Sequence, residues 1–325
     1  MQSIAKYKEE IASYLSSLQL EGQPNELYAP ISYILSLGGK QIRPVLTLMA
    51  TDVFNEDPKK ALHAATAIEL FHNFSLMHDD IMDDASLRRG HQTVHEKWDV
   101  NTAILSGDAM LILAYQYFEH YEPTIFRDLA KLFSKTAIEV CEGQQYDICF
   151  EQRTDVRIEE YIKMIEYKTA VLVAAALKMG AIIAQTTAEN GDQIYNFGLN
   201  LGIAFQLLDD HLDAFGDQAT FGKRIGGDIL ENKKTFLYLK ALEKANPNQR
   251  EELIRFYATA TCEDEEQKIE RVKQLFVETG SQQASLQLIE QYTEDALQTL
   301  ERLTIEEDKK ELLRIFSKEL MNRQM

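Results

Sequence analysis

The sequence reads LMHDDIMD at Leu76–Asp83 and FQLLDDHLD at Phe205–Asp213, so the pattern Asp-Asp-x-x-Asp occurs twice. On an α-helix, the first and last aspartates of this pattern lie about 40° apart on one face, one turn from each other. Acidic runs usually mark solvated helix faces, but both of these runs lie among apolar residues. We therefore expect two helices whose carboxylates bind a hard divalent cation. Mg²⁺ suits such a site better than Ca²⁺, because it retains several waters and substrate phosphates complete its coordination shell.

The remaining sequence predicts helix almost from end to end. Only 15 of the 325 residues are Gly and 6 are Pro, and apolar residues recur at helical spacing in Ile4–Leu18 and Leu286–Leu303. No segment alternates clearly enough to predict a strand. Breaks are expected at Gly22–Pro24, Gly38–Gly39, Asp57–Pro58, Glu122–Pro123, Asn190–Gly191, Phe215–Gly227 and Asn246–Pro247. None is a domain linker, so we expect an all-α chain with a single domain over residues 1–325 and outer helices after Glu263.

Charge and cysteine content narrow the class of partner. A net charge of −18 and a pI near 4.9 argue against nucleic acid or an anionic membrane, which need a basic face. Such an acidic protein can bind a polyphosphate only where metal ions and local cations reverse the field. Three cysteines without a C-x-x-C pair favour the reducing cytoplasm. The apolar stretch Val171–Ala184 is shorter than the roughly 20 residues that span a bilayer, so we expect no stable membrane insertion.

A polar residue precedes each acidic cluster on the same helix face. His72 lies about 20° from Asp79, and Gln206 about 60° from Asp209. Two such helices facing each other would enclose a deep cavity with metal ions at its mouth.

Basic residues are spread among the acidic clusters. Lys40 and Arg43 follow a glycine pair and share one face near a helix N-terminus, which also attracts anions. Arg88 and Arg89 follow the first cluster closely enough to reach a phosphate at the same metals. The other cations of this kind are Lys168, Lys223, Lys233 and Lys234. Each is compatible alone with a solvated surface, but together they indicate phosphate recognition.

Taken together, these motifs resemble the trans-polyprenyl diphosphate synthase family, and within it the short-chain geranylgeranyl and farnesyl diphosphate synthases. The motifs are GGKxxRP at Gly38–Pro44, HDDxxDx4RRG at His78–Gly90, Lys168-Thr169, FQxxDDxxD at Phe205–Asp213 and GKxxGGD at Gly222–Asp228. The resemblance implies an isoprenoid-synthase helical bundle around a deep central apolar cavity, three Mg²⁺ ions per active site, and a homodimer. The implied reaction is the head-to-tail condensation of isopentenyl diphosphate with an allylic diphosphate.

The resemblance also implies roles for single positions. The expected Mg²⁺ ligands are Asp79, Asp83 and Asp209, with further ligands or supporting carboxylates at Asp80, Asp210 and Asp213. The residues implied to hold the allylic diphosphate are Arg88, Lys168, Lys223 and Lys233. Those implied to hold isopentenyl diphosphate are Lys40, Arg43, His72 and Arg89. Thr169 and Gln206 would place oxygen atoms near the developing carbocation. At the C-terminus, only Arg323 could supply the basic cap common in relatives.

Product length is expected to depend on residues upstream of Asp79, because the growing tail should descend beside that helix. Ser75 is small and about 40° from Asp79, while Phe71 lies about 80° away and roughly 12 Å down the helix. Phe74 is about 140° from the metal face, so its role rests on the resemblance. Ordinary packing of both rings is the alternative. The pattern favours a C20 product, geranylgeranyl diphosphate, over C15 farnesyl diphosphate or a longer chain.

Three other classes of protein fit parts of the sequence. Glu69 and His72 form a Glu-x-x-His unit, which di-iron proteins use twice, but no other histidine has a glutamate three residues before it. A terpene cyclase normally has a mixed second metal motif and needs no second diphosphate site. A non-catalytic partner subunit typically loses its acidic clusters, and both are intact here.

Overall fold

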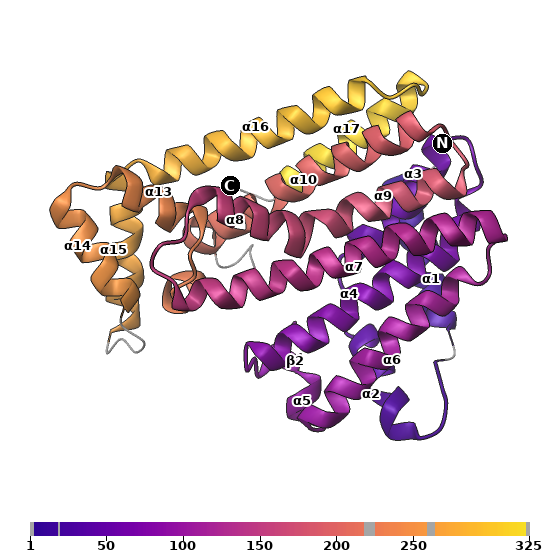
Figure 1. The fold of residues 1–325 in the computed structure, drawn as a ribbon, viewed down its shortest axis with the longest axis horizontal. Coiled ribbons are helices and arrows are strands. Elements are labelled where there is room, and N and C mark those ends of the chain that lie inside the picture. Colours follow the sequence, from indigo (N-terminus) through magenta and orange to yellow (C-terminus); the bar gives the residue numbers. More distant parts are fainter. Residues whose placement is uncertain (1–2, 19, 218–224, 259–263, 323–325) are drawn as a thin grey trace. The chain divides into compact units, whose positions relative to one another are not determined.

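The computed structural model describes residues 3–18, 20–217, 225–258 and 264–322, and these are helical almost throughout (Figure 1). This confirms the all-α prediction. The chain divides into two compact units, Met1–Ser134 with Ala175–Asp192 and Lys135–Ala174 with Gln193–Met325. The expectation of a single domain over residues 1–325 stays a prediction.

The first unit is built around helix α4. Its complete elements are α1 (Ile4–Ser17), α2 (Asn25–Ser36), α3 (Ile42–Val53), the 3-10 turn η1 (Pro58–Ala61), α4 (Leu62–Met82), β1 (Leu87–Arg88), β2 (His91–Gln92), α5 (Val94–Lys97) and α6 (Val100–Phe118). Small and apolar residues from Ala64 to Phe71 are buried around α4, which packs against α3 and α6. The amphipathic α1 covers this core with Ile4, Tyr7 and Ile11. The second acidic residue of the first cluster, Asp80, is thereby held on a firmly packed helix.

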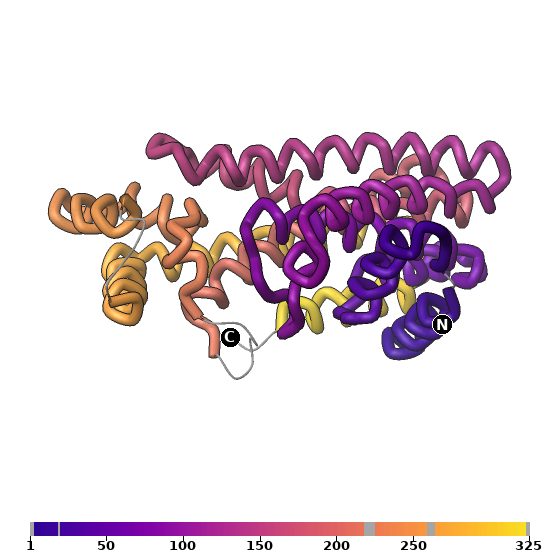
Figure 2. Tube along the Cα trace, turned by 90° about the horizontal axis from the view of Figure 1, so that it is seen from below, coloured from indigo at the N-terminus to yellow at the C-terminus, as the bar shows by residue number. Residues whose placement is uncertain are grey.

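The second unit places the other acidic cluster on a long helix. Its complete elements are α8 (Ile158–Ile165), the π-helical turn η2 (Glu166–Ala170), α12 (Gly227–Leu230), α13 (Phe236–Lys244), α14 (Pro247–Ala258), α15 (Glu265–Glu278), α16 (Ser281–Glu301) and α17 (Glu307–Met321). Helices α7 (Pro123–Gln152), α9 (Val171–Ile183) and α10 (Ala188–Phe215) contribute residues to both units. The core packs α13 against α16, while α14 and α15 lie side by side (Figure 2). The polar helices after Glu263 pack onto this core.

Two local expectations are wrong. A short antiparallel hairpin pairs Leu87 with Gln92 and Arg88 with His91, where no strand is expected. The predicted break at Asn190–Gly191 lies inside α10, because the Thr187 hydroxyl accepts a hydrogen bond from the Asn190 amide at 3.2 Å and caps the first turn.

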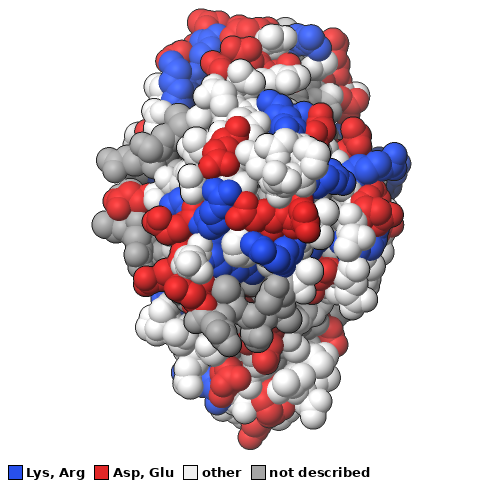
Figure 3. Space-filling view, turned by 90° about the vertical axis from the view of Figure 1, so that its left-hand side faces the viewer, with Lys and Arg blue, Asp and Glu red and all other residues white. Residues whose placement is uncertain are grey.

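Charged surface side chains are interspersed. On the face drawn in Figure 3, basic and acidic residues alternate. In the second unit, Arg314 forms ion pairs with Glu301 and Glu307 at 2.5 and 2.6 Å, and Arg271 pairs with Glu252 at 2.7 Å. These pairs neutralise acidic side chains locally, while the net charge of the chain stays at −18. Among the described residues, no helix is both long enough and apolar enough to cross a membrane.

Candidate active site

The first acidic cluster occupies the C-terminal turn of α4. The Asp83 amide donates to the Asp79 carbonyl at 2.9 Å, so these two residues lie one turn apart, as predicted. The side chain of Asp80 is 3% exposed and is held by Arg88, whose Nε lies 2.8 Å from both carboxylate oxygens and whose terminal nitrogen lies 2.7 Å from one. Burial raises the pKa of Asp80, and the Arg88 guanidinium opposes that rise. Asp80 therefore supports Arg88, whereas Asp83 is exposed to solvent.

The β1–β2 hairpin explains why two arginines stand together. Its two-residue turn, Arg89-Gly90, has positive φ at both positions, 55° and 78°, as a type I′ turn requires. The hairpin directs Arg88 to Asp80. The guanidinium of Arg89 packs on Gly39, where a Cβ would lie 2.6 Å from a terminal nitrogen. Glycine at this position thus lets an arginine approach the backbone just before Lys40.

The residues predicted to hold isopentenyl diphosphate partly come together in the first unit. Arg43, in the first turn of α3, donates to Nε2 of His72 at 3.2 Å. Burial lowers the pKa of His72 well below its usual value, and the charge of Arg43 adds to the fall, so the imidazole is neutral near pH 7. Among the described residues, the buried Nε of Arg43 has no hydrogen-bond partner. This N–H is available to an anionic oxygen.

Glu69 is a site residue that the sequence reading missed in this role. It is 4% exposed, and Asn73 donates to its Oε1 at 3.2 Å. Burial raises the pKa of Glu69, while the charges of Arg43 and then Arg89 lower it. Glu69 is therefore a buried carboxyl group within electrostatic range of two of the predicted substrate-binding arginines. A lone glutamate inside the apolar run of α4 was the available signal.

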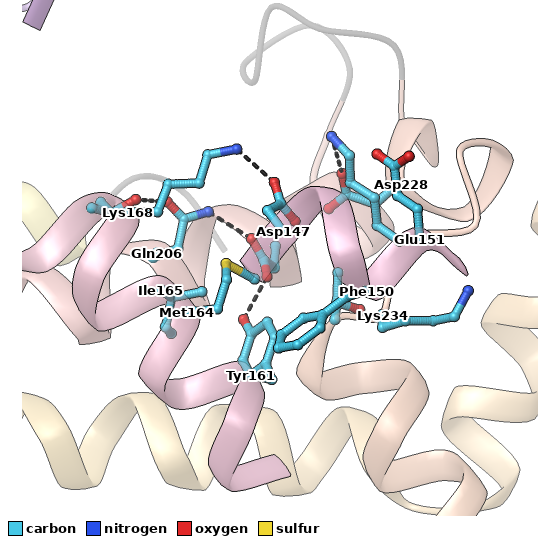
Figure 4. A pocket seen from close by; sticks show the side chains of 14 residues that line it. Asp147, Phe150, Glu151, Tyr161, Met164, Ile165, Lys168, Gln206, Asp228 and Lys234 are labelled. Carbon is cyan, nitrogen blue, oxygen red and sulfur yellow. Dashed lines mark hydrogen bonds and ion pairs between the residues drawn. The ribbon is translucent and has the colours of Figure 1, made fainter. Parts of the chain in front are cut away.

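In the second unit, Asp210 is the centre of a hydrogen-bonded chain (Figure 4). It accepts bonds from the Tyr161 hydroxyl at 2.5 Å and from Gln206 Nε2 at 2.7 Å, and Gln206 Oε1 accepts from Thr169 at 3.0 Å. Burial raises the pKa of Asp210 to about 7, although these donors oppose the rise. These hydrogen bonds orient the Gln206 amide and place Thr169 beside it. Tyr161, a tyrosine seven residues before Lys168, was not identified from the sequence.

The other α10 carboxylates and the lysines of this unit also have partners. Asp213 accepts from the Asp228 amide at 3.0 Å, which ties α10 to the start of α12. Lys168 donates to Asp147 at 2.6 Å, and Lys233 lies 2.8 Å from Glu231 and 3.8 Å from Asp228. Burial lowers the pKa of Lys233, but the charges of Asp228 and Glu231 raise it more. The Lys233 ammonium is therefore charged at neutral pH.

These groups line one cavity within the second unit. Its polar lining is Asp147, Glu151, Lys168, Thr169, Gln206, Asp210, Asp228, Lys233, Lys234 and Thr235. Its apolar wall is Phe150, Tyr161, Met164 and Ile165. Buried carboxylates beside lysines suit a diphosphate accompanied by Mg²⁺, since the carboxylates supply the oxygen ligands that Mg²⁺ prefers. Lys223 and Arg323, also named from the sequence, lie outside the described residues.

The residues assigned to product length lie in an aromatic cluster of the first unit. Phe71, 1% exposed, has its ring centre 5.4 Å from that of Phe74 and 5.1 Å from that of Phe133. Phe74 also contacts His78, with ring centres 4.8 Å apart. The Ser75 hydroxyl donates to the His72 carbonyl at 2.8 Å. The rings thus pack against each other, and their effect on product length stays a prediction.

An all-α chain with Asp-Asp-x-x-Asp patterns on two helices has the isoprenoid-synthase class of fold. Residues 24–276 match the family described as polyprenyl synthetase. The chain is 38% identical over 291 residues to the geranylgeranyl pyrophosphate synthase of Geoglobus acetivorans, with 88% of each chain covered. It is 50% identical to a geranylgeranyl pyrophosphate synthase of known crystal structure, with a TM-score of 0.96 and 100% of both chains covered. It is 34% identical to the geranylgeranyl pyrophosphate synthetase of Pyrococcus horikoshii, whose structure it matches with a TM-score of 0.91. That match covers 99% of this chain and 98% of the other.

The chain belongs to the polyprenyl synthetase family and is a trans-prenyltransferase. The resemblance inferred from the sequence motifs is thereby confirmed, and isoprenyl diphosphates are the substrate class. Enzymes of this kind are generally Mg²⁺-dependent, which agrees with the carboxylates of both units.

Proposed function

We propose that this chain synthesises geranylgeranyl diphosphate, the C20 product, from isopentenyl diphosphate and a shorter allylic diphosphate. The observation that carries the proposal is the 50% identity, over the full length of both chains, to a geranylgeranyl pyrophosphate synthase. Relatives named for a C25 product exist, such as the geranylfarnesyl diphosphate synthase of Natronomonas pharaonis at 38% identity. Product length is therefore the point that needs an experiment.

The test is mass analysis of the products formed from isopentenyl and dimethylallyl diphosphate with Mg²⁺. A dominant C20 product supports the proposal, and a dominant C15, C25 or longer product contradicts it. Parallel reactions primed with geranyl and farnesyl diphosphate identify the preferred allylic substrate. A terpene cyclase would release hydrocarbon without consuming isopentenyl diphosphate, and a non-catalytic subunit would consume neither substrate.

In the proposed reaction, the allylic C–O bond breaks to leave diphosphate and a carbocation. Mg²⁺ bound by Asp79, Asp83 and Asp209, three ions in all, would stabilise the charge that develops on the leaving diphosphate. The family resemblance assigns Lys168 and Lys233, which lie in the second unit, to the allylic diphosphate as well. Arg88, which holds Asp80 in this structure, keeps its assignment to the allylic diphosphate. Asp80, Asp210 and Asp213 support the metal ligands or join them.

The remaining residues act on the second substrate and on the cation. Lys40, Arg43 and Arg89 bind the diphosphate of isopentenyl diphosphate, and neutral His72 holds Arg43 in place. Thr169 and Gln206 present oxygen atoms to the carbocation, because the chain to Asp210 fixes the orientation of the Gln206 amide. The double bond of isopentenyl diphosphate attacks the cation, and the released diphosphate takes the proton. Exclusion of water protects the cation from quenching.

A homodimer is the assembly we propose. In the first unit, α6 exposes Ile104, Leu105 and Ile112 at 40%, 59% and 59%. Leu105 and Ile112 lie seven residues apart on one helix face. Contiguous exposed apolar side chains mark protein contacts more often than solvent-facing surface. Light scattering should give a dimer mass for the parent, and the variant Leu105→Lys, Ile112→Lys should give a monomer mass.

A further inference from the structure

The π-helical turn η2 carries two of the proposed active-site residues, Lys168 and Thr169. It joins α8 to α9 in one continuous helix, and the Val171 amide bonds to the Glu166 carbonyl five residues earlier. A π turn is rare and less stable than α-helix, and it is found most often at functional sites. Neighbouring elements must therefore hold this turn in place.

On one side, α7 approaches the turn through Gly143. A Cβ at this position would lie 2.2 Å from the backbone nitrogen of Lys168 and 2.7 Å from its Cα. These are backbone atoms, which cannot swing away as a side chain can. One helical turn later on α7 stands Asp147, which accepts the 2.6 Å bond from the Lys168 ammonium. Gly143 thus lets α7 approach the backbone of Lys168, and Asp147 binds the side chain of the same residue.

On another side, α10 approaches the turn in the same way through Gly202. A Cβ here would lie 2.7 Å from the Cα of Ala170 and 2.8 Å from its Cβ. One helical turn later on α10 stands Gln206, which accepts from the Thr169 hydroxyl at 3.0 Å. The same spacing, a glycine followed four residues later by a polar acceptor, thus occurs on α7 and on α10.

We propose that Gly143 and Gly202 are positioning residues, which fix Lys168 and Thr169 by letting α7 and α10 close on the π turn. Ordinary contact begins at 3.4 Å, so an alanine at 143 requires a backbone shift of about 1.2 Å from its 2.2 Å contact. A shift of that size breaks hydrogen bonds to Lys168 and Thr169, and a misplacement of about 1 Å can cost a hundredfold in rate. This consequence for turnover rests on the proposed function. The close packing of Gly143 and Gly202 on the π turn, which we call the clamp, does not.

The test compares Gly143→Ala and Gly202→Ala with the matched control Gly191→Ala, which lies in α10 and has open space around its Cβ. Amide hydrogen exchange of peptides covering residues 166–171 reads the clamp without any substrate. We expect faster exchange there in both test variants and parental exchange in the control, with helix content unchanged by circular dichroism. Gly202→Ala, with the smaller intrusion, keeps the test decisive if Gly143→Ala does not fold. Unchanged exchange in the folded test variants would overturn the proposal.

Steady-state kinetics form the second arm. We expect Gly143→Ala to lower kcat about a hundredfold while KM for isopentenyl diphosphate stays within about threefold. In a Lys168→Ala background the same change should lower kcat by a clearly smaller factor than in the parent, because part of its effect acts through Lys168. Additive losses in this cycle would overturn the positioning role. If the parent transfers no prenyl group, the proposed function fails, and hydrogen exchange still decides the clamp.

Discussion

The ion pair between Arg88 and Asp80 offers a quantitative test of how the first acidic cluster is supported. One guanidinium makes three contacts of 2.7 to 2.8 Å with a carboxylate that is 3% exposed. Breaking a buried pair by removing one partner costs about 3 to 5 kcal/mol. The Arg88 side chain is 24% exposed, so water can replace part of its contribution. We therefore expect Arg88→Ala to lower the free energy of unfolding by about 2 to 3 kcal/mol.

The measurement is urea unfolding at pH 7 in EDTA, followed by the fluorescence of Trp98. Trp98 is the single tryptophan of the chain and lies in the first unit with its ring centre 5.3 Å from that of Tyr33. It therefore reports on the unit that contains the pair. In an Asp80→Asn background, Arg88→Ala should cost less than about 1 kcal/mol, because no buried charge is left unpaired. A cost below about 0.5 kcal/mol in the parent, or equal costs in both backgrounds, would refute the reasoning.

Four further results are expected. Asp79→Ala and Asp209→Ala should each lower kcat at least about a hundredfold with helix content intact, because each removes a proposed metal ligand; near-parental rates in saturating Mg²⁺ would contradict this. Lys40→Ala should raise KM for isopentenyl diphosphate about tenfold, through a lost charged contact, and KM for the allylic substrate much less; equal changes would mean that the two pockets are wrongly assigned. Phe74→Ala should lengthen the product seen by mass spectrometry, and an unchanged product would assign this ring to packing alone. Burial raises the pKa of Asp210 to about 7 in the metal-free protein, so the protonated carboxyl stabilises the fold below about pH 4, and this stabilisation is lost as pH rises through 7. The free energy of unfolding of Asp210→Asn, compared with that of the parent, should therefore rise between about pH 4 and about pH 7. A constant difference would argue against the raised pKa.

The helices could be predicted because their signals are local and repeated. The periodic apolar positions Tyr7 and Ile11 in α1, and Ile289 and Ala296 in α16, are buried as the pattern requires. The β1–β2 hairpin was missed because two-residue strands leave no alternation to detect. The π turn η2 was missed for a related reason, since one extra residue does not change composition.

The candidate site was predictable where residue type alone indicates chemistry. Paired aspartates and clustered cations can be recognised in the sequence as candidate metal and phosphate ligands. The predicted partners Arg43 and His72 are in contact, with Nη1 of Arg43 3.2 Å from Nε2 of His72. Glu69, Asp147 and Tyr161 were not found, because their roles depend on which side chains the fold brings beside them. Glu69 has one local signal, a lone glutamate inside an apolar run, but Asp147 and Tyr161 have none, since their partners Lys168 and Asp210 come from other elements.

The hairpin that carries Arg88 and Arg89 has a thermodynamic consequence. Consecutive residues of one tight turn contact Asp80 of the acidic cluster and Gly39 beside the Lys40 segment. A ligand that draws Arg88 away from Asp80 pulls on the same peptide that positions Arg89. Such a connection couples the two binding events energetically, and thermodynamic linkage requires this coupling to be reciprocal. Each diphosphate should therefore alter the affinity for the other by the same factor, whichever of the two binds first.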